Sequence, residues 1–248
     1  MWNFFGKIFS DEYVNRPAIG SNGLLLLMYR FAYPFAVILD RLQISPNKIT
    51  TLSLVFALGS FGALVIDKGW LLFACFWGLA VLFDFCDGTV ARMTDKVSKT
   101  AFRYDHLSDL FKISLVFLGV AVRYDDMQLW IWAFAATFFL MYGDILNSEL
   151  RFAISQQVAT NTEDLSQSHS GLTNRHWLVV WGAKQALLLR IYRNLRAILL
   201  TVNGHFLLWF FVFPFGLRCA QFVFCYLIFI ELWAVKSRIA TLVRMRRS

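Results

Sequence analysis

Long apolar runs without charged residues alternate with short charged segments along the chain. Roughly 20 helical residues cross a bilayer, so runs of this length predict membrane-spanning helices. Apolar side chains fill each run on all sides, which is typical of helices surrounded by lipid and by other helices. The pattern predicts six spans, built on residues 49–66, 69–83 (continuing as helix to about Met93), 113–122 (starting near Ala101), 127–143, 197–217 and 219–235.

Two further segments lie outside this series. Residues 17–39 are uncharged except for Arg30, and Asp40 and Arg41 follow directly. These charges favour an amphipathic helix lying in the membrane interface, and a seventh span is the alternative. Residues 155–176 are rich in Ser, Thr, Asn and Gln, which predicts a polar cytoplasmic loop.

Composition supports a membrane protein and excludes several other classes. Of the 248 residues, 58% are hydrophobic and 16% are charged, against about 25% charged in soluble domains. An ordinary soluble domain, a disordered chain and a disulfide scaffold are therefore excluded. The four cysteines form no C-x-x-C pair, so neither a disulfide nor a zinc site is expected.

The net charge of +8 is explained by membrane topology rather than by nucleic acid. If the N-terminus is cytoplasmic, the inner segments carry 21 Lys and Arg residues and the outer turns carry 3, as the positive-inside rule requires. Both ends are therefore expected in the cytoplasm. The predicted fold is all-α and integral to the membrane, with a cytoplasmic N-terminus and interfacial helix (1–45), a six-helix transmembrane domain (46–240) and a basic cytoplasmic tail (241–248).

Four aspartates gather where the second and third spans face each other. Asp84 and Asp87 lie near the end of one predicted helix, and Asp105 and Asp109 near the start of the next. The spacings put each pair on one helix face, and Lys112 shares the face of the second pair. Carboxylates in membrane segments are costly unless they are compensated. Oxygen ligands select hard cations such as Mg²⁺ or Mn²⁺, and four carboxylates suit two ions about 3.5–4 Å apart, as in phosphoryl displacement.

The residues beside the aspartates suit a phosphate-bearing substrate. Gly88 and Ala91 have almost no side chain, so a ligand could approach the helix backbone there. Arg92 offers a planar donor fork that matches phosphate, and Lys96 and Lys99 add positive charge.

The stretch D-F-C-D-G-T-V-A-R, followed by Asp105 and Asp109, resembles the signature of the CDP-alcohol phosphotransferases. That signature reads D-x-x-D-G-x-x-A-R-x8-G-x-x-x-D-x-x-x-D, and this chain departs from it only at Ala101, where the family has glycine. Pro46-Asn47-Lys48-Ile49-Thr50 also resembles the P-N-x-x-T of many members. An interfacial helix followed by six spans matches the plan of the family.

The resemblance implies a reaction in which a hydroxyl group attacks a CDP-alcohol, forms a phosphodiester and releases CMP. It implies that all four aspartates hold two divalent cations and that Asp109 is also the general base. It further implies a phospholipid-synthesising enzyme and suggests a homodimer. With the topology predicted above, the active site is expected to face the cytoplasm, in a bacterial inner membrane. The CDP site would be lined by Asn47, Thr50, Gly88, Ala91, Arg92, Ser98 and Ala101.

The donor is expected to be CDP-diacylglycerol and the acceptor a small polar alcohol. The sequence leaves open the reverse arrangement, in which CDP-choline or CDP-ethanolamine donates to diacylglycerol. A cation transporter and a lipid-binding scaffold are the alternatives from other classes. Against a transporter, the carboxylates are predicted near one membrane surface rather than at its midplane. A scaffold would need neither all four aspartates nor Arg92.

Overall fold

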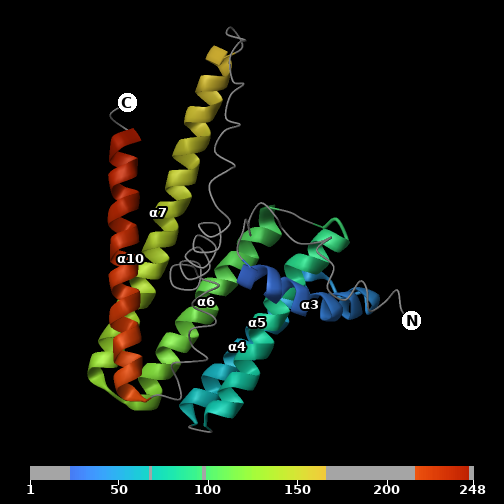
Figure 1. Ribbon diagram of the computed structural model, residues 1–248, viewed down its shortest axis with the longest axis vertical. Helices are drawn as coiled ribbons and strands as arrows, with labels where there is room; N and C mark the ends of the chain where they lie inside the picture. Colours follow the sequence, from blue (N-terminus) through green and yellow to red (C-terminus); the bar gives the residue numbers. More distant parts are fainter. Residues whose placement is uncertain (1–22, 67–68, 97–98, 166–215, 246–248) are drawn as a thin grey trace, which may run out of the picture.

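The computed structural model describes residues 23–66, 69–96, 99–165 and 216–245, and these residues form helices without a β-strand. The helices are α3 (Gly23–Arg41), α4 (Pro46–Val65), α5 (Trp70–Met93), α6 (Lys99–Tyr124), α7 (Met127–Leu165) and α10 (Leu217–Met245). Figure 1 shows them as two groups, with α3, α4, α5 and α6 on one side and the long pair of α7 and α10 on the other. The all-helical class predicted from the sequence is confirmed.

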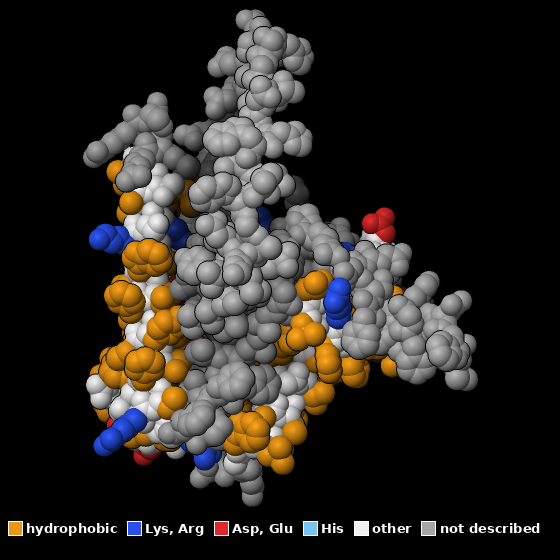
Figure 2. Space-filling view, viewed as in Figure 1, with side chains coloured by type: hydrophobic (Ala, Val, Ile, Leu, Met, Phe, Trp, Pro, Cys, Tyr) orange, Lys and Arg blue, Asp and Glu red, His pale blue; other side chains and the backbone are white. Residues whose placement is uncertain are grey.

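Four of these helices contain segments long and apolar enough to cross a membrane: Pro46–Val65, Trp70–Met93, Met127–Leu150 and Leu217–Val243. α5 ends at Met93, where the sequence predicted. α6 is not among the four, because its first half carries the charged residues of the candidate site. The predicted span at 197–217 lies almost entirely outside the described residues, so the count of six stays a prediction. Apolar side chains gather on the visible face of α10 (Figure 2). Phe222, Phe229 and Trp233 are among the exposed apolar residues of this helix.

α7 is much longer than the sequence predicted. The helix runs through residues 155–165, where a polar loop was expected, and ends at Leu165. That part of the loop prediction is wrong, and residues 166–176 lie outside the described part of the chain. No glycine or proline occurs between Gly143 and Gly171, so nothing in the sequence breaks the helix where its apolar character ends.

α3 runs across α5 instead of alongside it (Figure 1), and the two helices pack together. Ala32 and Ala36 are completely buried in this contact, and the Cys86 thiol lies 3.5 Å from the Ala32 carbonyl oxygen. Small side chains thus let the two backbones approach closely. Large apolar side chains remain exposed elsewhere on α3, at Leu27, Phe31, Phe35 and Ile38. An interfacial position would bury them in lipid, and that position stays a prediction.

The site is positioned by α4 packing against both α5 and α6. A β-carbon on Gly119 of α6 would lie only 2.7 Å from Leu64 Cδ1 of α4, so these two helices meet closely. Ser53 of α4 is fully buried and donates a hydrogen bond to the Ala80 carbonyl of α5, at 2.8 Å. These contacts fix the faces of α5 and α6 that carry the aspartates.

Candidate metal centre and phosphate site

Three of the four predicted metal ligands lie close enough to share one cation. Asp84 of α5 and Asp105 and Asp109 of α6 each offer a carboxylate oxygen, and these oxygens lie within 4.8 Å of one another. All three side chains are half-buried. The close approach of like charges in a partly desolvated place is unfavourable unless a cation compensates it, so the arrangement suits a metal ion.

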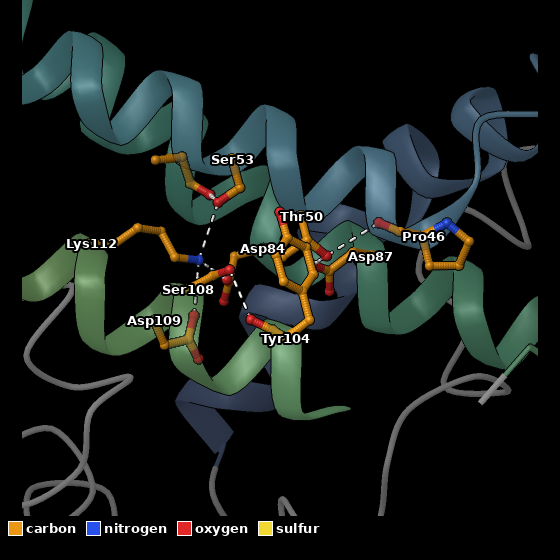
Figure 3. Close-up of polar contacts among 10 residues, drawn as sticks. Pro46, Thr50, Ser53, Asp84, Asp87, Tyr104, Ser108, Asp109 and Lys112 are labelled. Carbon is orange, nitrogen blue, oxygen red and sulfur yellow. Dashed lines mark hydrogen bonds and ion pairs between the residues drawn. The ribbon is translucent and has the colours of Figure 1, made fainter. Parts of the chain in front are cut away.

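Asp87 occupies a different place in the cluster. Its Oδ2 accepts a hydrogen bond from the Thr50 hydroxyl at 2.6 Å, and both side chains are buried. Figure 3 shows Thr50 reaching from α4 toward Asp87 on α5. The sequence predicted Thr50 as a CDP contact, and the structure gives it a carboxylate partner. A hydroxyl held against a carboxylate fixes the rotamer of a candidate metal ligand.

The carboxylate oxygens of the cluster are incompletely satisfied by the protein. Asp105 Oδ1 is buried and accepts no hydrogen bond from any of the described residues. A buried polar atom without a partner costs about 1–3 kcal/mol, and the cost is larger when the group is charged. A hard divalent cation would complete its coordination, so the residues present fit a metal of this kind.

Lys112 is a residue that the sequence placed on the face of Asp105 and Asp109 without giving it a role. Its ammonium group is buried against Asp84, against Asp109 Oδ1 at 2.8 Å and against Ser53 Oγ at 3.2 Å. Figure 3 shows Nζ between the side chains of Asp84, Asp109 and Ser53. The signal was its position three residues after Asp109, on the same helix face. A lysine is almost never fully buried unless it is paired.

Arg92 and Gly88 lie side by side in the half of α5 that is predicted to be nearer the cytoplasm. A β-carbon on Gly88 would lie 3.3 Å from Arg92 Nη1, so the guanidinium occupies the space beside the glycine. Arg92 Nη2 donates to Thr89 Oγ1 at 3.4 Å, and the guanidinium lies over the ring of Tyr29, 5.2 Å from its centre. Tyr29 of α3 thus contributes a cation–π contact that sequence analysis did not predict.

The other predicted CDP contacts are less completely described. Asn47 is exposed in the first turn of α4, and Ala91 is half-buried one position before Arg92. Ser98 lies outside the described residues, as does the side chain of Ala101 on α6.

A second polar contact joins α6 to α7 beside the cluster. His106 Nε2 lies 2.6 Å from Asp144 Oδ1, and both side chains are partly exposed. His106 follows the candidate ligand Asp105 directly, so this contact fixes the start of α6 against α7. The sequence alone gave neither residue a functional role.

Comparisons with known proteins agree with the geometry. The family model described as CDP-alcohol phosphatidyltransferase matches residues 43–212, which is more than half of the chain and includes all four aspartates. A comparison with curated proteins gives no match. The resemblance carried by the motif is therefore confirmed over most of the membrane domain. The chain belongs to the CDP-alcohol phosphatidyltransferase family, whose members are transferases that move a phosphorus-containing group from a CDP-alcohol.

Proposed function

We propose that this protein transfers a phosphatidyl group from CDP-diacylglycerol to the hydroxyl of a small polar alcohol and releases CMP. The observation that carries the proposal is the group formed by Asp84, Asp105 and Asp109, together with the unpartnered oxygen of Asp105. Four aspartates in this arrangement would hold two divalent cations, Mg²⁺ or Mn²⁺. Bound cations of this kind supply Lewis-acid stabilisation of the diphosphate and of the leaving CMP.

The chain's own residues would bind and orient the two substrates. Arg92, fixed by Tyr29 and Thr89, presents a donor fork to a phosphate of the CDP group beside Gly88. Thr50 holds Asp87 in place. The remaining CDP contacts in the proposal are Asn47, Ala91, Ser98 and Ala101.

Asp109 acts as the general base in this mechanism. One of its carboxylate oxygens accepts the proton of the acceptor hydroxyl while the hydroxyl oxygen attacks the phosphorus that carries the diacylglycerol. A new phosphorus–oxygen bond forms, and the bond from that phosphorus to the bridging oxygen of the diphosphate breaks. CMP leaves with that oxygen.

The position of the cluster supports an enzyme over a cation transporter. The aspartates lie in the second half of α5 and in the first half of α6, whereas transporters bind their ions near the bilayer midplane. With the predicted orientation, the site faces the cytoplasm, in a bacterial inner membrane. Lipids and a second copy of the chain are the expected partners within the membrane.

The test is CMP release by the purified full chain with a panel of donors and acceptors. We expect release only with a divalent cation, CDP-diacylglycerol and one class of small alcohol. Release with CDP-choline or CDP-ethanolamine and diacylglycerol would establish the alternative direction. If no pair of donor and acceptor gives CMP and the protein conducts cations in proteoliposomes, the protein is a transporter and the proposed enzymatic function is wrong.

A further inference from the structure

Lys112 places a cation of the protein itself inside the carboxylate cluster. Its side chain is 1% exposed, and Nζ is paired with both Asp84 and Asp109 Oδ1. These aspartates are two of the three that could hold a metal ion together. The ammonium group therefore occupies carboxylate oxygens that a second divalent ion would need.

A hydrogen bond to Ser53 of α4 also fixes the position of the ammonium group. The Ser53 hydroxyl donates its only hydrogen to the Ala80 carbonyl oxygen at 2.8 Å. Its lone pairs are therefore free to accept from Lys112 Nζ, 3.2 Å away. Ser53, Asp84 and Lys112 come from α4, α5 and α6, so one amine joins the three helices that build the site.

The carboxylate oxygens that are not paired with Lys112 leave room for one metal ion beside Asp105. Asp105 Oδ1 has no hydrogen-bond partner among the described residues. Asp109 Oδ1 has no hydrogen bond there either, but it forms an ion pair with Lys112 Nζ at 2.8 Å. Asp87 is bound to Thr50 on α4. Asp105 Oδ1 is thus the oxygen most available to a metal, because Asp109 Oδ1 is already paired with the ammonium group.

We propose that the Lys112 ammonium group takes the place of one divalent cation until the donor binds, so that the donor-free site holds a single metal ion. The inference rests on the proposed function, because it treats the cluster as the metal centre of a transferase. A fixed monovalent cation compensates part of the carboxylate charge and repels a second divalent ion. The second ion then enters with the diphosphate of the donor, whose own oxygens provide the missing ligands. Lys112 is a positioning residue in this scheme.

The experiment counts Mn²⁺ bound to the purified full chain in lipid nanodiscs, without donor, by electron paramagnetic resonance. We expect about one tightly bound ion in the unchanged protein and about two in Lys112→Met. Lys112→Arg keeps the charge and is expected to keep the lower count. Lys236→Met is the matched control, because Lys236 is an exposed lysine on α10.

Ser53→Ala keeps the inference testable if Lys112→Met does not fold, which thermal unfolding would reveal. Removing the hydroxyl frees the ammonium group from its anchor, so the second ion should bind at least about tenfold more tightly. Two tight ions in the unchanged protein, or equal counts and affinities in all variants, would overturn the inference. CMP release is measured beside the ion count. If the unchanged protein releases CMP but binds two ions without donor, the role of Lys112 is wrong and the proposed transferase function stands. If the ion counts are as expected but no donor gives CMP, the proposed transferase function is wrong and the role of Lys112 in metal binding stands.

Discussion

The Thr50 hydroxyl has two acceptors within reach but only one hydrogen. Its distance is 2.6 Å to Asp87 Oδ2 and 3.2 Å to the Pro46 carbonyl oxygen. The shorter contact to the charged acceptor is the stronger one. Thr50 therefore acts through Asp87, and its effect on catalysis is indirect.

Thr50→Val should weaken divalent-cation binding by about 10–100-fold, as is usual when the partner of a metal ligand is lost. Valine keeps the shape of threonine, so the melting temperature should change little by comparison. Thr50→Ser should restore most of the affinity, and Ser60→Ala is a control, because the Ser60 hydroxyl is bonded to its own helix at the Ala57 carbonyl. Titration calorimetry with Mn²⁺ measures the effect. Equal cation affinity in Thr50→Val and the unchanged protein would show that Thr50 does not orient Asp87.

Asp87→Asn and Asp109→Asn should fail in different ways. A neutral amide is a poor ligand for a hard cation, so Asp87→Asn should lose metal-dependent donor binding. Asp109→Asn should retain much of that binding but lose roughly 10²–10⁴ in turnover, the usual contribution of a general base. Donor binding and CMP release are measured on each folded variant. If Asp109→Asn loses donor binding and keeps turnover at saturating metal, Asp109 is a ligand only.

Ala101 is where the chain departs from the family motif. If the methyl group narrows the nucleotide site, Ala101→Gly should lower the KM for the CDP donor and leave kcat nearly unchanged, which is the mark of uniform binding. Steady-state kinetics with varied donor measures this. An unchanged or higher KM would show that the site has adapted to alanine.

The sequence predicted that Asp84, Asp105 and Asp109 lie close together, because helical spacing fixes which residues share a face. It could not predict Thr50 as the partner of Asp87 or the burial of Lys112 against Asp84. Both contacts join residues of different helices, and they depend on how those helices are rotated about their axes. The sequence placed Lys112 on the face that meets Asp84 and Asp87, but it did not show that the ammonium group would pair with Asp84.

At the scale of helices, the close contact between α4 and α6 sets the geometry of the site. Gly119 of α6 has no side chain where a β-carbon would meet Leu64 Cδ1 at 2.7 Å, and Leu64 is completely buried. A larger residue must move Leu64 or separate the helices.

Gly119→Ala should therefore destabilise the protein by about 1–3 kcal/mol, the usual cost of overpacking a core. Gly62→Ala is the matched control, since a β-carbon there would meet nothing within 4 Å and alanine favours the helix. Thermal unfolding in detergent compares the two variants with the unchanged protein. If Gly119→Ala is as stable as Gly62→Ala, the α4–α6 contact is looser than the structure indicates.

Helix ends were predictable only where charges or breakers mark them. Asp67 and Lys68 follow the end of α4, and α5 begins directly after Gly69. α7 continues beyond its apolar segment, where the sequence has no glycine or proline. The thickness of a bilayer limits the length of the apolar segment but not the length of the helix. For that reason the apolar pattern did not reveal that the helix continues as far as Leu165.

At the scale of the molecule, the orientation in the membrane decides which substrates reach the site. The 21 to 3 distribution of Lys and Arg predicts that both ends and the α5–α6 turn lie in the cytoplasm, which is where soluble alcohols and nucleotides are expected. The same prediction puts residues 66–69, between α4 and α5, outside.

Single cysteines at Ser10, Ser166 and Ser248 should react with a membrane-impermeant reagent only from the cytoplasmic side, and one at Asp67 only from outside. The native cysteines are replaced by alanine in this background, and permeabilised membranes serve as the control in which all four positions react. If Ser10 is cytoplasmic, the segment that contains α3 does not cross the membrane, as expected of an interfacial helix. Labelling of Ser10 from outside, with the other three positions as expected, would instead make the segment that contains α3 a seventh span and would place the N-terminus across the membrane from the active site.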